Sequence, residues 1–292
     1  MAPTPPRRTS AARTVLEVVR LSTAYLRDRG GDSARLDAEL LVAHALGLRR
    51  LDVYLQYDRP LTGAELDTVR ELLRRRGRGE PLAYLTGTRE FFGRAFRVTP
   101  AVLVPRPETE TLVERALRAA GDRDLALRIA DLGTGSGCVA CTLAAELPRA
   151  TVIGADLSRA ALGVAAANAE ALGVASRVLL VEGGWEEGLV EAVDMVVSNP
   201  PYVTSAEMEA LPRDVTFEPG MALDGGADGL DAYPVIFAAV AERSPAVRWV
   251  GVEVDSRRAI AVTELARAVW PSAAISVSRD LAGRPRVVEV TP

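Results

Sequence analysis

Residues 127–137, LRIADLGTGSG, decide the fold class of this chain. An apolar run of strand length leads directly into glycines at three alternate positions, Gly133, Gly135 and Gly137, and a helix-forming stretch follows them. Glycine permits tight turns, and without a Cβ it lets a ligand approach the main chain closely. The stretch therefore predicts a buried strand, a ligand-binding loop and a helix in direct succession.

Six more strand candidates follow along the chain, and helical stretches separate the early ones. These candidates are residues 151–157, 177–183, 194–199, 248–254, 273–278 and 286–290. Strands that alternate with helices form a mostly parallel, doubly wound sheet, and ligands bind beyond the carboxyl ends of its strands. We therefore expect an α/β domain over residues 108–292, with site residues at the strand ends.

Residues 1–85 have helical patterns and no strand pattern. Apolar residues recur at helical spacing over 15–26 and 36–47, and Thr62 and Glu65 form a capping box that opens a third helix. Helices alone over this length predict a small bundle, which we expect to pack or to bind a partner protein.

Residues 86–107 differ from both of these regions. Two short apolar and aromatic runs flank Gly93, which predicts a hairpin. Pro105 and Pro107 then exclude a regular helix before residue 107. We interpret the segment as a hairpin and linker between the two domains.

The composition is that of a globular protein with two domains. The chain has 292 residues, of which 48% are hydrophobic and 25% charged. No apolar run approaches the roughly 20 residues that cross a bilayer, and the N-terminal segment MAPTPPRRTSAAR lacks the apolar core of a signal peptide. We expect a cytoplasmic protein without a membrane partner, and a monomer because no assembly stripe stands out.

All the basic residues are arginine, and the charge is unevenly distributed. Residues 1–85 contain 15 arginines against 11 acidic residues, a net charge of +4, whereas the rest of the chain carries −8. A nucleic-acid-binding protein is expected to carry a basic stripe, and these totals indicate none. We therefore expect no direct binding of nucleic acid.

Cys138 and Cys141 form a C-x-x-C pattern, which occurs in redox and metal sites. A zinc site requires about four ligands, and the single histidine, His44, is far away in sequence. Because the pair lies inside the helix predicted after the glycine loop, we interpret it as two small packed thiols in a reducing compartment and expect no metal.

The glycine loop alone is weak evidence for any one ligand, because dinucleotide-binding folds carry such a loop too. Their pattern, G-x-G-x-x-G, started at Gly133, requires glycine at 138, where this chain has Cys138. A pyrophosphate at the helix N-terminus would also be repelled by Asp131. A carboxylate at this position suits a ligand with an ammonium or sulfonium group, and the loop resembles motif I of the class I S-adenosylmethionine-dependent methyltransferases.

Two further strand ends carry residues that suit such a cofactor. Asp156 ends the second predicted strand, where a carboxylate can accept hydrogen bonds from both hydroxyls of a ribose. The alternative is an N-cap for the helix that starts near Ser158. Trp185 follows the third strand and offers an indole that could cover an adenine ring, with simple packing as its alternative.

The fourth strand ends in DMVVSNPPY, residues 194–202. Methyl transfer is an in-line displacement, and a planar NH₂ group is a poor nucleophile until acceptors hold both of its N–H groups and fix its plane. The Asn199 side-chain carbonyl and the Pro200 main-chain carbonyl are two such acceptors, Tyr202 can stack on the flat group, and Pro201 helps to stiffen the turn. The motif predicts a clamp for an amide or exocyclic amine nitrogen, the alternative being a Pro-Pro loop with an aromatic ring packed behind it.

NPPY is shared by adenine-N6 DNA methyltransferases and protein glutamine-N5 methyltransferases, so the surrounding segments decide between them. Over almost the whole chain these segments closely resemble the bacterial peptide chain release factor glutamine methyltransferases. They are LDAELLVAHALGL (36–48), GEPLAYLTGTREFFG (79–93), VTPAVLVPRPETE (98–110), DLGTGSG (131–137), NPPYV (199–203), FEPGMALDGGADGL (217–230) and SRDLAGRPRVVEV (278–290).

The resemblance implies an N-terminal helical domain that recognises the substrate protein, a hairpin, and a Rossmann-like class I methyltransferase domain with a seven-stranded sheet. It implies transfer of a methyl group from S-adenosyl-L-methionine, with S-adenosyl-L-homocysteine as product, to the glutamine of the Gly-Gly-Gln motif of class 1 release factors. By position it implies cofactor contacts at Asp131, Gly133, Thr134, Gly135, Ser136, Gly137, Asp156, Trp185 and Asn199. It implies catalytic or glutamine contacts at Asn199, Pro200, Pro201 and Tyr202, with Arg106 and Glu110 either lining the site or ending the linker.

Three departures from the family pattern lie outside the NPPY motif. Gly184 stands where the family usually has aspartate, which removes a hydrogen-bonding group for adenine. Asp255 and Arg258 replace the glycine and glutamine expected after the fifth strand, although Glu253 is kept, and ERSPAVRW (242–249) replaces the glycine turn expected before that strand. Methylation of a ribosomal-protein glutamine, methylation of DNA adenine and non-catalytic binding remain the alternative functions.

Overall fold

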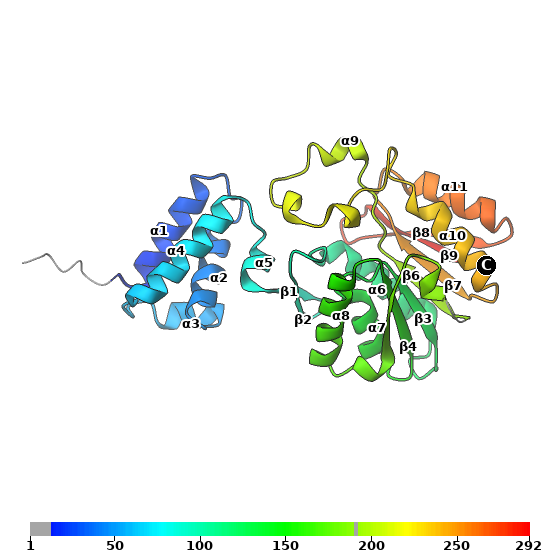
Figure 1. Cartoon of the computed structure of the whole chain (residues 1–292), viewed down its shortest axis with the longest axis horizontal. Helices are drawn as coiled ribbons and strands as arrows, with labels where there is room; N and C mark the ends of the chain where they lie inside the picture. Colours follow the sequence, from blue (N-terminus) through cyan, green and yellow to red (C-terminus); the bar gives the residue numbers. More distant parts are fainter. Residues whose placement is uncertain (1–12, 190–191) are drawn as a thin grey trace, which may run out of the picture. The chain divides into compact units, whose positions relative to one another are not determined.

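The computed structural model describes residues 13–189 and 192–292. The chain divides into two compact units, which end and begin at Thr86 and Gly87 (Figure 1). In the described part of the chain, none of the helices has the length and apolar content that would let it cross a membrane.

The first unit is a helical bundle, in agreement with its helical sequence pattern. Its helices are α1 (Val15–Arg27), α2 (Ala34–Ala45), α3 (Arg50–Leu55), α4 (Gly63–Gly77) and α5 (Leu82–Thr86). Apolar side chains of α1, α2, α3 and α4 share one core, which includes Val15, Val42, Val53 and Val69. The sequence indicates α1, α2 and α4, whereas α3 and α5 are too short to show a periodicity.

The second unit begins with a hairpin of β1 (Thr88–Phe91) and β2 (Arg94–Arg97). The rings of Phe91 and Phe96 contact edge to face, with centroids 6.0 Å apart, and both are buried in the core of this unit. Asn168 holds the hairpin, because its Oδ1 accepts from the Arg97 N–H at 2.7 Å and its Nδ2 donates to the Arg97 carbonyl at 3.0 Å. The segment expected to link the domains therefore packs as part of the second unit.

All seven predicted strands form one sheet, which confirms the doubly wound α/β fold. They are β3 (Arg128–Leu132), β4 (Thr151–Asp156), β5 (Val178–Glu182), β6 (Met195–Ser198), β7 (Trp249–Glu253), β8 (Ala274–Arg279) and β9 (Pro285–Thr291). The spatial order is β5-β4-β3-β6-β7-β9-β8, and the pairs β7–β9 and β9–β8 are antiparallel, whereas the other neighbouring strands are parallel. The order reverses between β3 and β6, which lie side by side.

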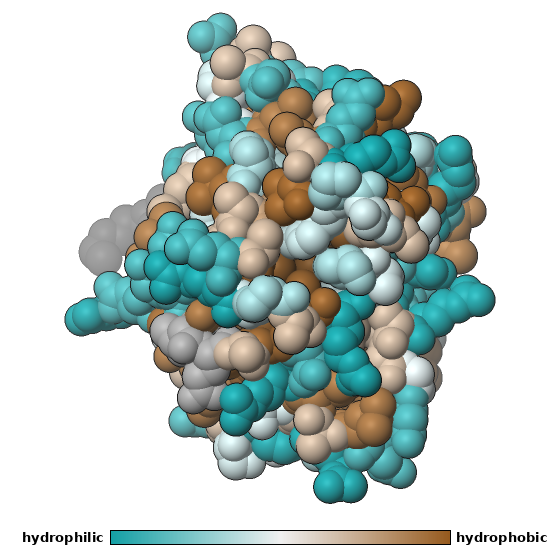
Figure 2. All heavy atoms as spheres, turned by 90° about the vertical axis from the view of Figure 1, so that its right-hand side faces the viewer, coloured by the Kyte–Doolittle hydropathy of each residue, from teal (hydrophilic) through white to brown (hydrophobic). Residues whose placement is uncertain are grey.

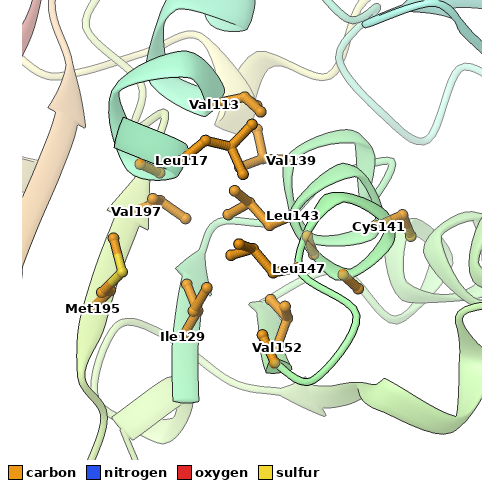
Figure 3. Close-up of a cluster of buried hydrophobic side chains, with 14 of the residues drawn as sticks. Val113, Leu117, Ile129, Val139, Cys141, Leu143, Leu147, Val152, Met195 and Val197 are labelled. Carbon is orange, nitrogen blue, oxygen red and sulfur yellow. The ribbon is translucent and has the colours of Figure 1, made fainter. Parts of the chain in front are cut away.

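Helices cover both faces of this sheet. The first face packs on α6 (Glu110–Ala120), α7 (Cys138–Glu146) and α8 (Arg159–Ala171), and the second on α10 (Ala232–Arg243) and α11 (Ala259–Val269). Figure 3 shows the first core, where Leu143 of α7 and Leu147, just after the end of α7, lie against Ile129 and Val152 of the sheet. Because strand side chains alternate between faces, the neighbouring Ala130 belongs to the second core.

In the second unit, these two cores contain most of the buried hydrophobic side chains. On the face drawn in Figure 2, hydrophilic side chains are interspersed with small, scattered hydrophobic areas. This mixture is ordinary for the surface of a globular protein.

The capping box of α4 gives a test of the first unit. The Thr62 hydroxyl accepts from the Glu65 N–H at 3.3 Å, and the Glu65 carboxylate accepts from the Thr62 N–H at 2.8 Å. Thr62→Ala should destabilise this helix by about 1 kcal/mol, seen as faster hydrogen exchange of the α4 amides. The matched control is Thr68→Ala in the exposed middle of the same helix, where alanine suits the helix at least as well. Equal exchange in the two variants would contradict this account of the helix start.

Candidate functional site

The glycine loop connects the end of β3 to α7. Gly133, Gly135 and Gly137 have φ angles of 77°, 55° and 74°, in the left-handed region that favours glycine. The N–H groups of Gly133 and Thr134 both donate to the Ala155 carbonyl at 2.9 Å, which ties the loop to the end of β4. A Cβ on Gly133 would lie 3.2 Å from the Trp185 ring. Glycine at 133 therefore lets the loop and the indole approach each other closely.

A cavity of about 270 Å³, the larger of two cavities that adjoin at the NPPY turn, lies at the carboxyl ends of β3, β4 and β6. It is lined by most of the residues that the sequence assigns to the cofactor: Asp131, Gly133, Thr134, Gly135, Asp156, Trp185 and Asn199. Ser136 and Gly137 are not among its lining residues. Ser136 instead accepts a hydrogen bond from Asn168 Nδ2 at its carbonyl, at 2.8 Å, and so supports the loop from behind.

Asp131 is the carboxylate at the inner wall of this larger cavity, and its side chain is almost fully buried. Its Oδ2 accepts from the Thr134 hydroxyl at 2.7 Å and from the Ala140 N–H at 3.0 Å. Burial nevertheless dominates and raises the pKa of Asp131 to about 6. A cation bound in the cavity would favour the charged carboxylate and lower this pKa.

Asp156 lies at the end of β4 and also lines the larger cavity. Its Oδ2 accepts from the Gly135 N–H and its Oδ1 from the Ser158 N–H, both at 2.8 Å. Each oxygen has a second lone pair, so the carboxylate can still accept from a ligand. The N-cap of α8 is Ser158, whose hydroxyl accepts from the Ala161 N–H at 3.2 Å. The alternative that Asp156 itself is this N-cap is therefore wrong.

A smaller cavity of about 150 Å³ lies beside the NPPY turn. Its wall includes Asn199, Pro200 and Tyr202, and it shares Asn199 and Arg106 with the larger cavity. Pro201 faces the larger cavity instead. The turn thus lies where two cavities adjoin, with Asn199 exposed to both.

The Asn199 side chain is held at one end only. Its Nδ2 donates to the Thr109 hydroxyl at 3.2 Å. Its Oδ1 has no partner among the residues that the structure describes, and remains available as an acceptor. The side chain therefore has one fixed donor and one unused acceptor at the junction of the cavities.

Tyr202 connects the NPPY turn to Glu253, a buried carboxylate at the end of β7, by a hydrogen bond. The Tyr202 hydroxyl donates to Glu253 Oε1 at 3.4 Å, and the Tyr233 hydroxyl donates to the Glu253 main-chain carbonyl at 3.0 Å. Burial raises the pKa of Glu253 to about 7 and raises the pKa of Tyr202 well above its ordinary value. Tyr202 is therefore neutral near pH 7 and suited to stacking rather than to proton abstraction.

The resemblance implied site roles for two residues of RPETE (106–110), and the structure brings Arg106 to the cavities and not Glu110. Arg106 Nη2 donates to Glu218 Oε1 at 2.6 Å, and Glu218 Oε2 accepts from the Val104 N–H at 3.0 Å. Glu110 lines neither cavity, because its Oε1 accepts from the Phe92 N–H of the hairpin turn at 2.7 Å. Glu110 is thus placed as a support of the hairpin.

Thr109 and Glu218 were not predicted as site residues, although both lie in segments that resemble the family, residues 98–110 and 217–230. Residues 107–109 form a 3₁₀ turn, which brings residues three apart onto the same side. Arg106 and Thr109 therefore face the cavities together, and Glu110 is rotated away. The spacing of three residues between Arg106 and Thr109 could have indicated that Thr109 faces the site. Glu218 is a single acidic residue before Pro219, and nothing in the local sequence indicates that it pairs with Arg106.

The departures from the family pattern differ in their placement. Gly184 lines the larger cavity, where its N–H donates to Glu187 Oε2 at 2.8 Å and it offers no side chain. Asp255 and Arg258 line neither cavity. Arg258 donates to Glu207 Oε2 and to the Asp228 carbonyl, both at 2.8 Å, and so holds the segment that follows the NPPY turn.

Cys138 and Cys141 are buried free thiols. Burial raises the pKa of both thiols to about 12, so they remain protonated and unreactive near neutral pH. In the described ranges, no three histidine, cysteine or acidic side chains come together as a group that could hold a metal ion.

The contrast between two Glu110 variants tests its placement. Glu110→Ala leaves the partly buried Phe92 N–H without its acceptor and should lower the free energy of unfolding by about 1 kcal/mol. Glu110→Gln keeps a carbonyl oxygen there and should lose clearly less. Urea unfolding followed by tryptophan fluorescence measures this, since the three tryptophans, at 185, 249 and 270, all lie in the second unit. Equal losses in the two variants would contradict the assignment.

Comparison with known families and structures agrees with both units. The family described as PrmC N-terminal domain matches residues 17–87, and the family described as methyltransferase small domain matches residues 109–215. Among solved structures, the hMettl16 catalytic domain in complex with a MAT2A 3′UTR hairpin has a TM-score of 0.58 at 17% identity, over 72% of this chain and 80% of that one. This likeness supports the methyltransferase fold.

Curated relatives cover nearly the whole chain. The release factor glutamine methyltransferase of Geobacter sulfurreducens is 44% identical over 243 residues, which are 82% of this chain and 84% of that protein. The protein of the same name from Bradyrhizobium diazoefficiens is 42% identical over 276 residues, 92% of each chain. At this identity and coverage, the chain belongs to the release factor glutamine methyltransferase family.

Proposed function

We propose that the protein transfers a methyl group from S-adenosyl-L-methionine to the side-chain amide nitrogen, N5, of the glutamine in the Gly-Gly-Gln motif of class 1 release factors. The observation that carries the proposal is the unused Oδ1 of Asn199 at the junction of the two cavities. Family membership supplies the substrate class. This arrangement supports a site in which the larger cavity holds the methyl donor and the smaller cavity holds the acceptor amide.

The residues of the larger cavity fit S-adenosylmethionine. Asp131 provides negative charge for a cationic group, Asp156 has lone pairs for ribose hydroxyls, and the indole of Trp185 offers a flat apolar face. The chemistry this cofactor supplies when bound is a methyl group on a sulfonium, with S-adenosylhomocysteine left as product. Gly184 offers no side chain for the adenine, so we expect the protein to hold that ring by Trp185 and main-chain contacts.

The smaller cavity fits the acceptor glutamine. The lone pair of an amide NH₂ is delocalised, so the protein must hold the nitrogen in one plane and exclude water from it. On this proposal Asn199 Oδ1 and the Pro200 carbonyl accept one N–H each, and the Tyr202 ring stacks on the amide. The second N–H proton becomes acidic only as the N–C bond forms, so no strong base is needed beforehand.

The helical unit is our candidate for recognition of the release factor. Its mildly basic composition, 15 arginines against 11 acidic residues over 1–85, suits a protein partner better than it suits DNA. We propose a monomer that acts in the cytoplasm, where its substrate protein is made.

Labelled methyl transfer tests the proposed substrate. With methyl-labelled S-adenosylmethionine, the protein should label an unmodified class 1 release factor and should not label the same factor carrying Gly-Gly-Ala. Asn199→Ala should lower kcat roughly 100-fold, because misplacement of a reacting group costs about that much. Glu209→Ala, at an exposed position past the turn, is the matched control and should be unchanged. Label that enters only the large ribosomal subunit or only an adenine-containing duplex would refute the proposed substrate.

The pKa of Asp131 predicts a pH dependence for cofactor binding. Because burial holds this pKa near 6, the carboxylate is charged above pH 6 and is protonated progressively below it. The affinity for S-adenosylmethionine should therefore be constant from pH 7 to 8 and fall by up to about tenfold for each pH unit below 6. Asp131→Asn should bind more weakly at pH 8 and show no such fall.

Methylthioadenosine, which lacks the sulfonium and the ammonium, is the control ligand for this titration, measured by calorimetry. Its affinity for the wild-type protein should change little over the same pH range. An equal fall for both ligands would show that the dependence does not come from pairing of Asp131 with a cation.

A further inference from the structure

The side chain of Glu187 folds back over the two glycines that precede Trp185. Glu187 is the first residue of the 3₁₀ turn η3 (Glu187–Leu189), which follows β5. Its Oε2 accepts from the Gly184 N–H at 2.8 Å. Within residues 13–189 and 192–292, its Oε1 has no hydrogen-bond partner. The segment thus carries a carboxylate that is fixed by one oxygen and can accept from a ligand with the other.

Both glycines make room for this side chain. A Cβ on Gly183 would lie 2.3 Å from the Cβ of Glu187 and 2.6 Å from its Cγ, so a larger residue at 183 would displace it. A Cβ on Gly184 would lie 3.4 Å from Glu187 Oε2. The carboxylate of Glu187 therefore lies next to the space into which a side chain at 184 would extend.

This carboxylate lies beside the wall of the larger cavity. Gly183 and Gly184 line the cavity, whereas Glu187 is not among its lining residues. Leu157 lines it too, with a relative exposure of 64%, and its Cδ2 lies 3.9 Å from the same Cβ position at 184. Leu157 therefore offers an apolar surface for a flat ring, and the Glu187 carboxylate lies at the edge of that surface.

The ribose site determines which part of the cofactor faces this edge. Asp156 directly precedes Leu157, and its carbonyl accepts from the Gly183 N–H at 3.0 Å. On the proposed function Asp156 holds the ribose, so the attached purine extends over Leu157 along residues 183–184. The 6-amino group lies at the end of a purine that is away from the ribose. It is therefore the group of the cofactor that is suited to meet Glu187.

We infer that Glu187 recognises the 6-amino group of the adenine and so selects the base of the cofactor. The amino group is a hydrogen-bond donor and a carboxylate accepts, so the two are complementary. The inference rests on the proposed function, because it takes S-adenosylmethionine as the cofactor. It adds one side chain to the contacts that Trp185 and the main chain make with the ring.

A purely structural role is the alternative, since the bond to the Gly184 N–H also supports the start of the 3₁₀ turn. Two ligands separate the roles: S-adenosylhomocysteine, and its analogue in which hydrogen replaces the 6-amino group of the base. Calorimetry measures both affinities on each variant. Damage to the turn would weaken both ligands alike, whereas loss of recognition weakens only the ligand that has the amino group.

The wild-type protein should bind S-adenosylhomocysteine about tenfold more tightly than the analogue, because a hydrogen bond to a charged group contributes about that factor. Glu187→Ala should weaken S-adenosylhomocysteine about tenfold and the analogue by less than about twofold, so that the two affinities become nearly equal. Equal weakening of both ligands in Glu187→Ala would overturn the inference. Equal affinity of the wild-type protein for both ligands would overturn it too.

Glu186→Ala is the matched control for the loss of negative charge. Glu186 is the neighbouring exposed glutamate, its Oε2 pairs with Arg243 Nη2 at 2.5 Å, and it lines neither cavity. Both affinities should therefore remain those of the wild-type protein.

A second carboxylate provides a gain of function. The backbone at Gly184 is outside the left-handed region that favours glycine, so it can carry an aspartate. In the Glu187→Ala background, Gly184→Asp should restore a preference of at least about threefold for S-adenosylhomocysteine over the analogue.

These measurements require no release factor, so their outcome is separate from that of the labelling experiment. If the wild-type protein labels no release factor and still prefers the ligand with the amino group in the way described, the proposed substrate is wrong and the inference stands. If it labels the release factor and Glu187→Ala weakens both ligands equally, the inference is wrong and the proposed function stands.

Discussion

The reversal of strand order between β3 and β6 is the constraint on which the site depends. These strands are neighbours in the sheet and run parallel, so their carboxyl ends lie side by side. The chain leaves β3 through the glycine loop and leaves β6 through the NPPY turn. A ligand that lies over the first must therefore lie next to the second. Residues nearly 70 positions apart, Asp131 and Asn199, come to line one cavity for this reason.

Partly buried ion pairs then hold the segments that close the site. The pair of Arg106 and Glu218 joins the segment before α6 to the segment after the NPPY turn, and Arg258 with Glu207 anchors the far side of that later segment. Each pair has one mostly buried member, the Glu218 carboxylate and the Arg258 guanidinium, and the charge of that member favours keeping its partner in place. The unusual Arg258 thus serves the loop rather than the cofactor.

The sequence predicted the sheet well, because each strand is a short apolar run bounded by polar residues or glycine, and β3 and β6 end in recognisable motifs. It did not predict which residues of RPETE line the cavity: the charged Glu110 was proposed as a site residue, and the neutral Thr109 was not. Which of two adjacent residues faces a cavity depends on the rotation of one 3₁₀ turn. The role of Glu218 could not be predicted either, because its partner, Arg106, lies 112 residues away in the sequence. Local patterns carry no information on such pairs.

The central claim is that the NPPY turn presents only acceptors to the substrate side chain. Its most direct test compares release factors that carry Gly-Gly-Gln and Gly-Gly-Glu in binding to the protein saturated with S-adenosylhomocysteine. Glutamine and glutamate have the same shape, and glutamate offers acceptors where glutamine offers two N–H groups. The account predicts that the glutamate form binds at least about tenfold more weakly at pH 7.5. Equal affinity of the two forms would contradict it.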